Sequence, residues 1–584
     1  MRTGVIPFLI AAAAGGADPA PTPGDPTLDS LGRRFWAEHL STHPVEATAL
    51  GVRRFDDRLE DISPAGLARR RAARERLLRR VRGVPEAGLS PADRITRDAL
   101  IQQVESDLAR LDCRLEEWVI DPLEGPQIEF LNLESFQPVR TPAEGRAMVR
   151  RWRAMGPYLD AHAANLRRGL EAGRVAVRAA VERVVQEVRS TIARPDPEWP
   201  LLNPLRVEHA DWSPRERGAF REGLEGAVRE SVRPALERYL RFLEAEVLPR
   251  ARPEDRPGIV HLPGGVECYL RLIRVHTSLD GSPDEIHRIG LKESERIQEE
   301  IETLGGRLLG TSDRGEILRR LRADPALFFR TREEVAARAR EALARAREAL
   351  PAWFGVLPRA ACEVIPMAEH EEAHSTIAYY RQPAEDGSRP GRYYVNTSAP
   401  ESRPRYQAEA LAFHEAIPGH HLQIAIAQEL SGIPEFRRHT GVTAFVEGWA
   451  LYAERLAGEM DLYTSDLDRL GMLTFEAWRA GRLVVDTGMH AMGWSRTEAI
   501  RFLREHTALA ENNIVNEVDR YITWPGQALA YTTGQMEILR LREEARRRLG
   551  GRFDIRAFHD ELLRHGAVSL SQLRQILEAW ISAR

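Results

Sequence analysis

The sequence predicts a mainly α-helical protein, a large helical bowl or bundle with a deep channel, and a small β-hairpin or sheet beside residues 414–421. From Ser30 to about Arg250, Leu, Val and Ala recur at three- and four-residue spacing with Arg and Glu between them, which is typical of amphipathic helices. A second block with this spacing runs from Pro283 to Leu350. Strand-like alternation is rare outside residues 375–396, so we expect little sheet.

The length of the chain predicts more than one subdomain. Its 584 residues exceed what one hydrophobic core usually organises. The segment Pro253–Gly265, which contains several Pro and Gly residues, separates the two helical blocks. We therefore predict an N-terminal helical subdomain at 28–255 and a second, catalytic subdomain at 256–584.

The N-terminal segment 1–27 has the layout of a possible signal peptide followed by a disordered tether. Met1-Arg2 precedes an apolar stretch from Val5 to Ala14, and Ala17–Pro26 is rich in Pro and Ala. Export to the periplasm or the exterior follows if this segment is a signal peptide, and a cytoplasmic location follows if it is not.

Composition excludes several classes of function. The charged fraction is 29%, and the sequence contains no uninterrupted run of about 18 apolar residues, the length needed to span a membrane. The net charge is only -4, and acidic residues are interleaved with the arginines, so we expect no nucleic-acid partner. Cys113, Cys268 and Cys362 have neither the spacing of a thiolate zinc site nor the even number of a disulfide framework. A bound metal would therefore need His and carboxylate ligands.

Two strand-like segments precede the most informative motif. Residues 375–380 and 392–396 are rich in Tyr and β-branched residues and flank a turn-rich stretch at 382–391. We predict a β-hairpin there, which could offer an edge to an extended peptide.

The motif itself begins with His414-Glu415 and resembles the start of an HExxH zinc site. In such a site two histidines one helical turn apart bind the metal while the glutamate acts on water. Here position 418 is Pro, and the next histidine is His420, which an undistorted helix would turn away from His414. Since Pro418 and Gly419 favour a helix break, we predict a deformed helix that re-aims His420 or His421 toward His414.

Glu447 is the predicted third ligand. It lies in the apolar segment Phe445–Tyr452, and a buried carboxylate requires a cation or a metal as partner.

Four motifs in this order resemble the domain-of-unknown-function 885 family, which is more distantly similar to helical gluzincin peptidases such as thimet oligopeptidase and oligoendopeptidase F. The motifs are HEAIPGHHLQ (414–423), EGWALYAE (447–454), DTGMHAMGWS (486–495) and PGQALAYTTG (525–534). The resemblance implies that His414, His420 and Glu447 bind the metal, that Glu415 is the general base and that Tyr531 donates to the oxyanion.

Three further positions have more than one interpretation. His490 is either a core histidine bonded to Asp486, one helical turn earlier, or a catalytic residue that contacts the substrate or the oxyanion. Tyr531 could also be a half-buried aromatic residue. Arg479 and Arg482 could clamp a peptide carboxylate, but a surface role is favoured in so arginine-rich a chain.

The combined prediction is a zinc metallopeptidase with one Zn²⁺ ion that hydrolyses peptide bonds in short peptides, with Glu415 as general base to the metal-activated water. The alternatives are a metal-dependent amidase acting on a non-peptide amide and a non-catalytic helical binding protein stapled by a metal. The oligomeric state stays open.

Overall fold

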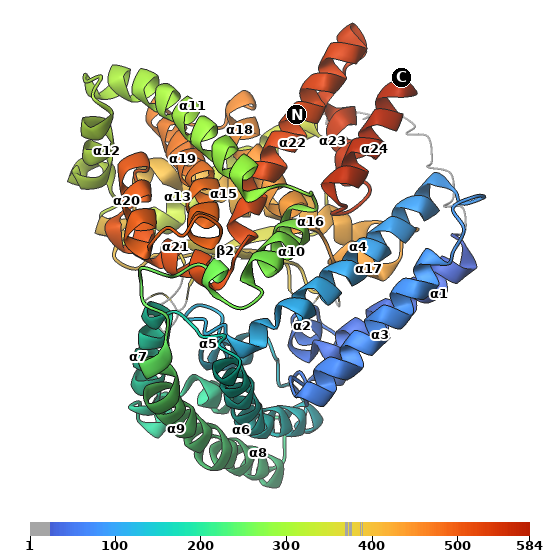
Figure 1. The fold of residues 1–584 in the computed structure, drawn as a ribbon, viewed down its shortest axis with the longest axis vertical. Helices are drawn as coiled ribbons and strands as arrows, with labels where there is room; N and C mark the ends of the chain where they lie inside the picture. Colours follow the sequence, from blue (N-terminus) through green and yellow to red (C-terminus); the bar gives the residue numbers. More distant parts are fainter. Residues whose placement is uncertain (1–23, 368–371, 373–375, 386, 388) are drawn as a thin grey trace, which may run out of the picture.

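The computed structural model describes residues 24–367, 372, 376–385, 387 and 389–584, and it confirms a mainly helical protein with one small sheet (Figure 1). The predicted signal segment lies almost entirely outside the described residues. Among the described residues, no helix is long and apolar enough to cross a bilayer.

The N-terminal half is built from helices. Many of them begin at a Ser-Pro or Thr-Pro pair, in which the hydroxyl caps a free backbone N–H and the proline fits the first helical position. The described helices are α1 (Pro26–Thr42), α2 (Pro44–Ala49), α3 (Pro64–Arg82), α4 (Pro91–Cys113), α5 (Pro126–Asn132), α6 (Pro142–Glu171), α7 (Arg178–Ile192), α8 (Pro214–Ala227) and α9 (Arg233–Phe242).

Two hydrophobic clusters fill this half. One lies between α1, α3 and α4 around Phe35 and Trp36, and it also takes in Phe436 from the C-terminal half. The other is built on α6 to α9 around Trp152, Trp199 and Tyr239 and ends at Ala251.

A disulfide joins the two halves and corrects the sequence interpretation of the cysteines. Cys113, at the end of α4, is bonded to Cys268 in α10, with Cα atoms 5.1 Å apart. The two cysteines are 155 positions apart, and pairing over such a separation cannot be deduced from spacing. Cys362 is the free, buried cysteine.

The C-terminal half carries the longest buried helix and the candidate site. In Figure 1, α11 lies along α19 across the upper part of the molecule. The helices are α10 (Gly265–Thr277), α11 (Pro283–Leu309), α12 (Arg314–Ala323), α13 (Arg332–Trp353), α15 (Ala408–Glu415), α16 (His420–Glu429), α17 (Glu435–His439), α18 (Thr443–Glu459), α19 (Asp466–His490), α20 (Arg496–His506), α21 (Glu511–Thr523), α22 (Ala530–Leu549), α23 (Ile555–Leu563) and α24 (Leu570–Ser582).

The sheet contains the predicted hairpin and one strand more. Strands β2 (Ala378–Arg381) and β3 (Gly391–Val395) pair antiparallel, with Tyr379 opposite Tyr394. Strand β1 (Cys362–Pro366) pairs with β3 in parallel, so β3 is central in the order β1-β3-β2. The sequence interpretation missed β1, since a parallel partner is joined through a long connection and leaves no hairpin signal.

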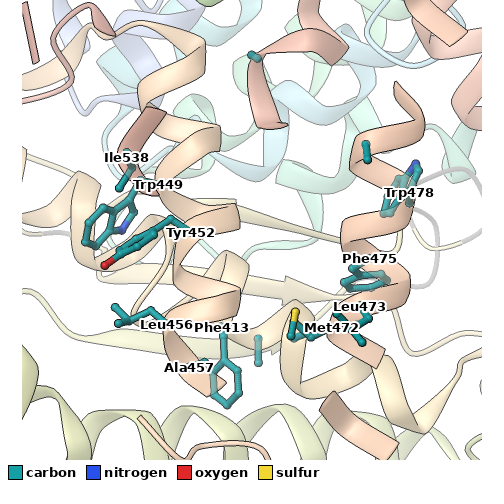
Figure 2. Packing of buried hydrophobic residues seen from close by; sticks show 14 of the residues in the cluster. Phe413, Trp449, Tyr452, Leu456, Ala457, Met472, Leu473, Phe475, Trp478 and Ile538 are labelled. Carbon is teal, nitrogen blue, oxygen red and sulfur yellow. The ribbon is translucent and has the colours of Figure 1, made fainter. Parts of the chain in front are cut away.

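The largest hydrophobic cluster fixes the helices that carry the site. Figure 2 shows Trp449 and Tyr452 of α18 on one side and Phe475 and Trp478 of α19 on the other, with Phe413 of α15 near α18. Phe413 and Trp449 have no exposed surface. Such packing leaves these helices little freedom to shift relative to one another.

Candidate metal centre

The predicted helix break is present and separates the two histidines. Helix α15 ends at Glu415, and α16 begins at His420. Pro418 has no N–H to continue the first helix. Backbone hydrogen bonding continues after the break: the N–H of His421 donates to the carbonyl of Ala416 at 2.9 Å, and the N–H of Gln423 donates to the carbonyl of Gly419 at 3.2 Å.

Two contacts define the path of the chain through the break. A Cβ on Gly419 would lie 1.9 Å from the carbonyl oxygen of His414, so only glycine fits this close approach. The indole Nε1 of Trp449 donates to the carbonyl of Pro418 at 2.9 Å. The break is therefore held by α18, the helix that also carries Glu447.

His414, His420 and Glu447 converge on one point. Oε2 of Glu447 lies 3.7 Å from Nε2 of His414 and 3.4 Å from Nε2 of His420, and one potential ligand atom from each residue lies within 4.8 Å of the others. A tetrahedral zinc ion with bonds of about 2.0–2.2 Å separates its ligand atoms by roughly 3.3 Å. The two distances from Glu447 are close to this value.

The carboxylate of Glu447 is partly buried, and its Oε2 atom faces the two histidines. Oε2 of Glu447 is enclosed and makes no hydrogen bond with a described residue. Burial by itself would raise its pKa, but His420 and His414 outweigh burial and hold the pKa well below the usual value. Glu447 is therefore a charged oxygen donor aimed at two imidazoles, which suits a divalent cation.

A second glutamate orients His414 and was not predicted from the sequence. Oε1 of Glu454 lies 2.8 Å from Nδ1 of His414, and Glu454 is fully buried. Burial would lower the pKa of His414, but the nearby carboxylates of Glu447 and Glu454 raise it to about 9, so a metal would have to displace a proton. Glu454 follows Glu447 by seven residues, two helical turns, and this spacing was the available signal.

Two glycines bring Tyr531 to the site. A Cβ on Gly448 would lie 2.4 Å from the Cα of Gly534, and one on Gly534 would lie 1.8 Å from the carbonyl of Ala444. Helices α18 and α22 can therefore approach closely, and Tyr531 lies one turn before Gly534. Its ring centre is 6.5 Å from that of His414, with the rings nearly parallel. Burial and the charge of Glu447 raise its pKa, so its hydroxyl is a donor at neutral pH.

Glu415 follows His414 at the end of α15. Its side chain is partly exposed, and the carboxylate forms no hydrogen bond or ion pair with a described residue. It lies close enough to Tyr393 of β3 to help burial raise the pKa of that phenol. An unpaired carboxylate next to a metal ligand is free to accept a proton.

His421 has a different environment from His420. Its Nε2 lies 3.0 Å from the carbonyl of Ala360, and its Nδ1 lies 2.9 Å from the hydroxyl of Tyr380. Both ring nitrogens are therefore used in fastening α16 to the sheet and the chain before it. The structure brings His420, and not His421, beside His414 and Glu447.

The structure does not support a catalytic role for His490. Its Nδ1 accepts from the N–H of Ile259 at 3.1 Å, and its Nε2 donates to the carbonyl of Tyr521 at 2.9 Å. Burial lowers its pKa to about 4, and no ring nitrogen is left for a substrate. Asp486 is not its partner either, because that carboxylate accepts from Tyr269 and Gly526. The core interpretation of His490 agrees with its burial, although its partners are Ile259 and Tyr521 and not Asp486.

The surface role favoured for Arg479 and Arg482 is also wrong. Both side chains are buried, and each guanidinium lies 4.3 Å from the ring centre of Trp478. Arg479 lies 3.6 Å from Glu454, the glutamate that orients His414. The large number of arginines in the sequence does not show which of them are buried, because burial depends on packing against helices that are distant in sequence.

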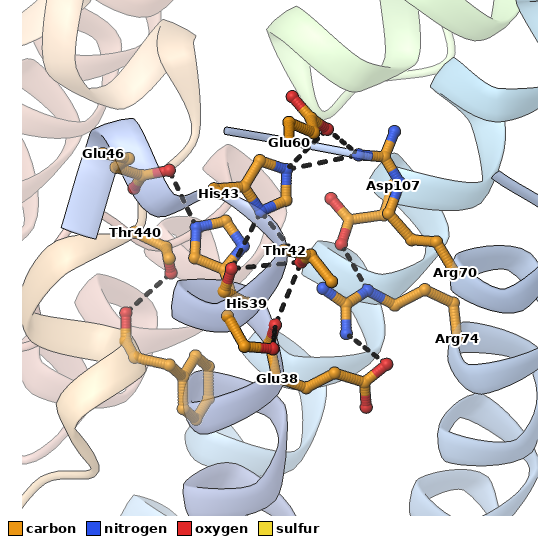
Figure 3. Close-up of polar contacts among 12 residues, drawn as sticks. Glu38, His39, Thr42, His43, Glu46, Glu60, Arg70, Arg74, Asp107 and Thr440 are labelled. Atoms are coloured by element: carbon orange, nitrogen blue, oxygen red, sulfur yellow. Dashed lines mark hydrogen bonds and ion pairs between the residues drawn. The ribbon is translucent and has the colours of Figure 1, made fainter. Parts of the chain in front are cut away.

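A second group of two histidines and a glutamate lies in the N-terminal half (Figure 3). Nε2 of His39 lies 3.0 Å from Oε2 of Glu46, and His43 lies within reach of both. Nδ1 of His43 contacts the carbonyl of His39 at 3.0 Å, and its Nε2 lies 3.5 Å from the guanidinium of Arg70. The same Nε2 lies 3.9 Å from Oε1 of Glu60, which is ion-paired with Arg70. His43 is therefore already engaged by an arginine and a further glutamate, and this group is the weaker metal candidate.

Comparisons with known proteins agree with the fold. The chain is 26% identical to the protein in the crystal structure of the putative lipoprotein from Colwellia psychrerythraea, with a TM-score of 0.91 over 95% of this chain and 99% of that one. A putative lipoprotein of unknown function from Shewanella oneidensis shares the fold at 19% identity, with a TM-score of 0.73 over 95% of this chain and 100% of that one. The search among curated proteins found no match. The model of the family described as bacterial protein of unknown function (DUF885) matches residues 44–577, and the chain therefore belongs to this family.

Proposed function

We propose that this protein is a zinc-dependent peptidase that hydrolyses peptide bonds in short peptides. The observation that carries the proposal is the convergence of His414, His420 and Glu447, with the unpaired Glu415 next to the first ligand. Nitrogen and oxygen ligands of this kind are those of catalytic zinc sites, which keep one position open.

The residues present fit one zinc ion. Its ligands would be Oε2 of Glu447, which has no hydrogen bond, and the Nε2 atoms of His414 and His420. Glu454 would fix the orientation of His414 through its contact with Nδ1. When bound, zinc supplies a Lewis acid that polarises the scissile carbonyl and acidifies water.

The chain itself would move the protons. Glu415 accepts a proton from the attacking water and delivers it to the leaving amine, as a carboxylate base and then acid. The hydroxyl of Tyr531 donates a hydrogen bond to the carbonyl oxygen as negative charge develops there. Its raised pKa keeps the phenol protonated for this role.

Similarity of motifs adds support. The pairs His414-Glu415 and Gly419-His420 and the segment Phe445–Glu447 are similar to the HEFGH and FVE segments of helical gluzincin peptidases. The same zinc and glutamate chemistry would serve a non-peptide amide, so a metal-dependent amidase is the second candidate. A non-catalytic protein stapled by the metal is the third, but structural zinc sites usually have four protein ligands, and three converge among the described residues.

The test combines metal analysis with hydrolysis. The purified protein is assayed for zinc and for cleavage of a quenched fluorescent peptide library, alongside Glu415→Gln. We expect about one zinc ion per chain in both proteins and cleavage in the parent alone. A parent that binds zinc and cleaves no peptide, but cleaves small amides, would favour the amidase.

We also propose an oxidising compartment for the protein. Disulfides such as Cys113–Cys268 persist in secreted and periplasmic proteins and are rare in the cytosol. The protein from Colwellia psychrerythraea is described as a putative lipoprotein, which points in the same direction. Mass spectrometry of the native protein with thiol alkylation, before and after reduction, would show whether this pair is oxidised.

A further inference from the structure

Two buried arginines next to the candidate site share one carboxylate. Oε2 of Glu517 lies 3.0 Å from a guanidinium nitrogen of Arg482 and 3.0 Å from one of Arg520. Tyr521 donates its hydroxyl to the same oxygen at 2.7 Å. Arg482 is only 3% exposed and Arg520 only 6%. One negative charge therefore serves two buried positive charges, and such a surplus is costly in a protein interior.

Arg482 has a donor to spare. Its Nε donates to the hydroxyl of Tyr521 at 3.0 Å, and its Nη2 donates to Glu517. Its Nη1 is enclosed and has no hydrogen-bond partner among the described residues. A buried N–H without a partner is destabilising, and a bound anion would satisfy it. A guanidinium N–H donates a charge-assisted hydrogen bond to a carboxylate.

The spare donor lies next to the proposed oxyanion donor. The Cζ of Arg482 is 4.2 Å from the ring centre of Tyr531, and this ring centre is 6.5 Å from that of His414. An extended peptide advances about 3.5 Å per residue. The guanidinium therefore lies within the length of about three extended residues of the metal ligand.

We propose that Arg482 binds the C-terminal carboxylate of the substrate, which would make the protein a carboxy-terminal exopeptidase that releases fragments of one to three residues. This proposal rests on the proposed peptidase function. The surplus positive charge recognises a carboxylate, and the short distance to His414 limits how many residues lie between that carboxylate and the scissile bond. A carboxylate on an aspartate or glutamate side chain of the substrate has the same chemistry, and the experiment separates the two sources.

The experiment measures binding without turnover. Zinc-loaded Glu415→Gln protein is titrated in a calorimeter with acetyl-Ala-Ala-Ala as the free acid, the same peptide as its amide, and acetyl-Ala-Glu-Ala amide. We expect the acid to bind at least about tenfold more tightly than either amide, as one charged hydrogen bond contributes. Adding Arg482→Gln should remove the difference and leave the affinity of the amides unchanged.

Three results would overturn the proposal. Equal affinity for the acid and its amide would mean that the protein does not recognise the terminal carboxylate. A difference in affinity that persists in Arg482→Gln would mean that another residue binds the carboxylate. Tight binding of the glutamate-containing amide would mean a side-chain carboxylate and not a terminal one. Arg542→Gln is the matched control, since Arg542 is also buried and ion-paired but lies about 16 Å further along α22 than Tyr531.

Folding and function are controlled separately. If Arg482→Gln is unstable by circular dichroism, Arg482→Lys replaces it and should keep the charge but reduce the preference for the acid, because the lysine ammonium does not place a donor at the position of Nη1. The parent enzyme is then given a ten-residue peptide, and the products are identified by mass spectrometry. Internal cleavage alone would sink the exopeptidase while the peptidase stands. Arg482-dependent binding of the acid without any hydrolysis would sink the peptidase while the subsite stands.

Discussion

Within the part of the chain that the structure describes, two groups of two histidines and one glutamate could hold a metal, and they differ in what each ring nitrogen faces. In the C-terminal group, Nε2 of His414 and Nε2 of His420 both face the free oxygen of Glu447, and Glu454 holds the far side of His414. In the N-terminal group, His39 is bonded directly to its glutamate, Glu46, at 3.0 Å.

The neighbours of the two groups differ as well. The side chain of Glu46 is 44% exposed, and the His39 ring stacks between Trp36 and His43. Arg70 approaches His43 from the side where a metal would bind. The C-terminal group has an unpaired carboxylate, Glu415, next to its first histidine, and the nearby Arg479 lies against Glu454. The closeness of histidine and glutamate side chains is therefore a weak criterion for a metal site. The two groups are distinguished by which ligand atoms have no hydrogen bond and by the charge of the residues that face those atoms.

The largest expected effect is loss of the metal. His414→Ala with Glu447→Ala removes two of three ligands, so zinc content should fall from about one ion per chain to near zero, with loss of peptide hydrolysis. The matched change, His39→Ala with Glu46→Ala, should leave both unchanged. Zinc content is measured by atomic emission on dialysed protein. Loss of zinc in the second variant and not the first would reverse the comparison.

Glu415→Gln should separate chemistry from metal binding. The amide keeps the shape of the side chain but cannot accept the proton from water, so turnover should fall by about 10²–10⁴ while zinc content and thermal stability stay near normal. Glu46→Gln is the control carboxylate and should turn over at the parental rate. A Glu415→Gln protein without zinc would make Glu415 a ligand or a structural residue.

Tyr531→Phe should lower turnover by about 10²–10³, the cost of one oxyanion donor, with metal content and fold retained. The ring contacts with His414 and Arg482 survive in phenylalanine, so only the hydroxyl is tested. Tyr406→Phe is the control, because its hydroxyl is also buried but bonds the distant carbonyl of Leu321. Unchanged turnover in Tyr531→Phe would reduce the residue to a packing role.

The comparison also shows what the sequence could and could not predict. The helix break was predictable, since Pro418 and Gly419 act on the backbone locally. Glu447 was predictable because an acidic residue in an apolar helical segment requires a partner. Local sequence patterns do not predict strand β1, the Cys113–Cys268 disulfide or the burial of Arg482, because each depends on contacts between segments distant in sequence. His490 was misread for the same reason: Ile259 and Tyr521, its partners, lie far away in sequence.

Glu454→Gln should have a smaller effect than loss of a ligand. The amide can still accept from His414 but has no charge to stabilise the imidazole, so zinc affinity should weaken by about 10- to 100-fold, as for other residues that orient ligands. Competition with a chelator measures the affinity. The charge of Arg479 would then lack its nearby carboxylate, so thermal stability is recorded in parallel. An unchanged zinc affinity would mean that Glu454 serves Arg479 alone.

The smallest effect concerns pH and the N-terminal group. Burial lowers the pKa of His43 below the usual value of 6.5, since Glu60 offsets burial only in part and His39 adds to it. The unfolded chain therefore binds a proton at His43 before the folded chain does, so the stability contributed by this group is lost as pH falls below about 6.5. One group gives a slope of at most about 1.4 kcal/mol per pH unit.

Other buried histidines add to the total, so the measurement is the difference in unfolding free energy between the parent and His43→Gln from pH 7 to pH 5.5. We expect the parent to lose more stability than the variant, and we expect added zinc to leave this difference unchanged. A difference that grows with zinc would give the N-terminal group a metal after all.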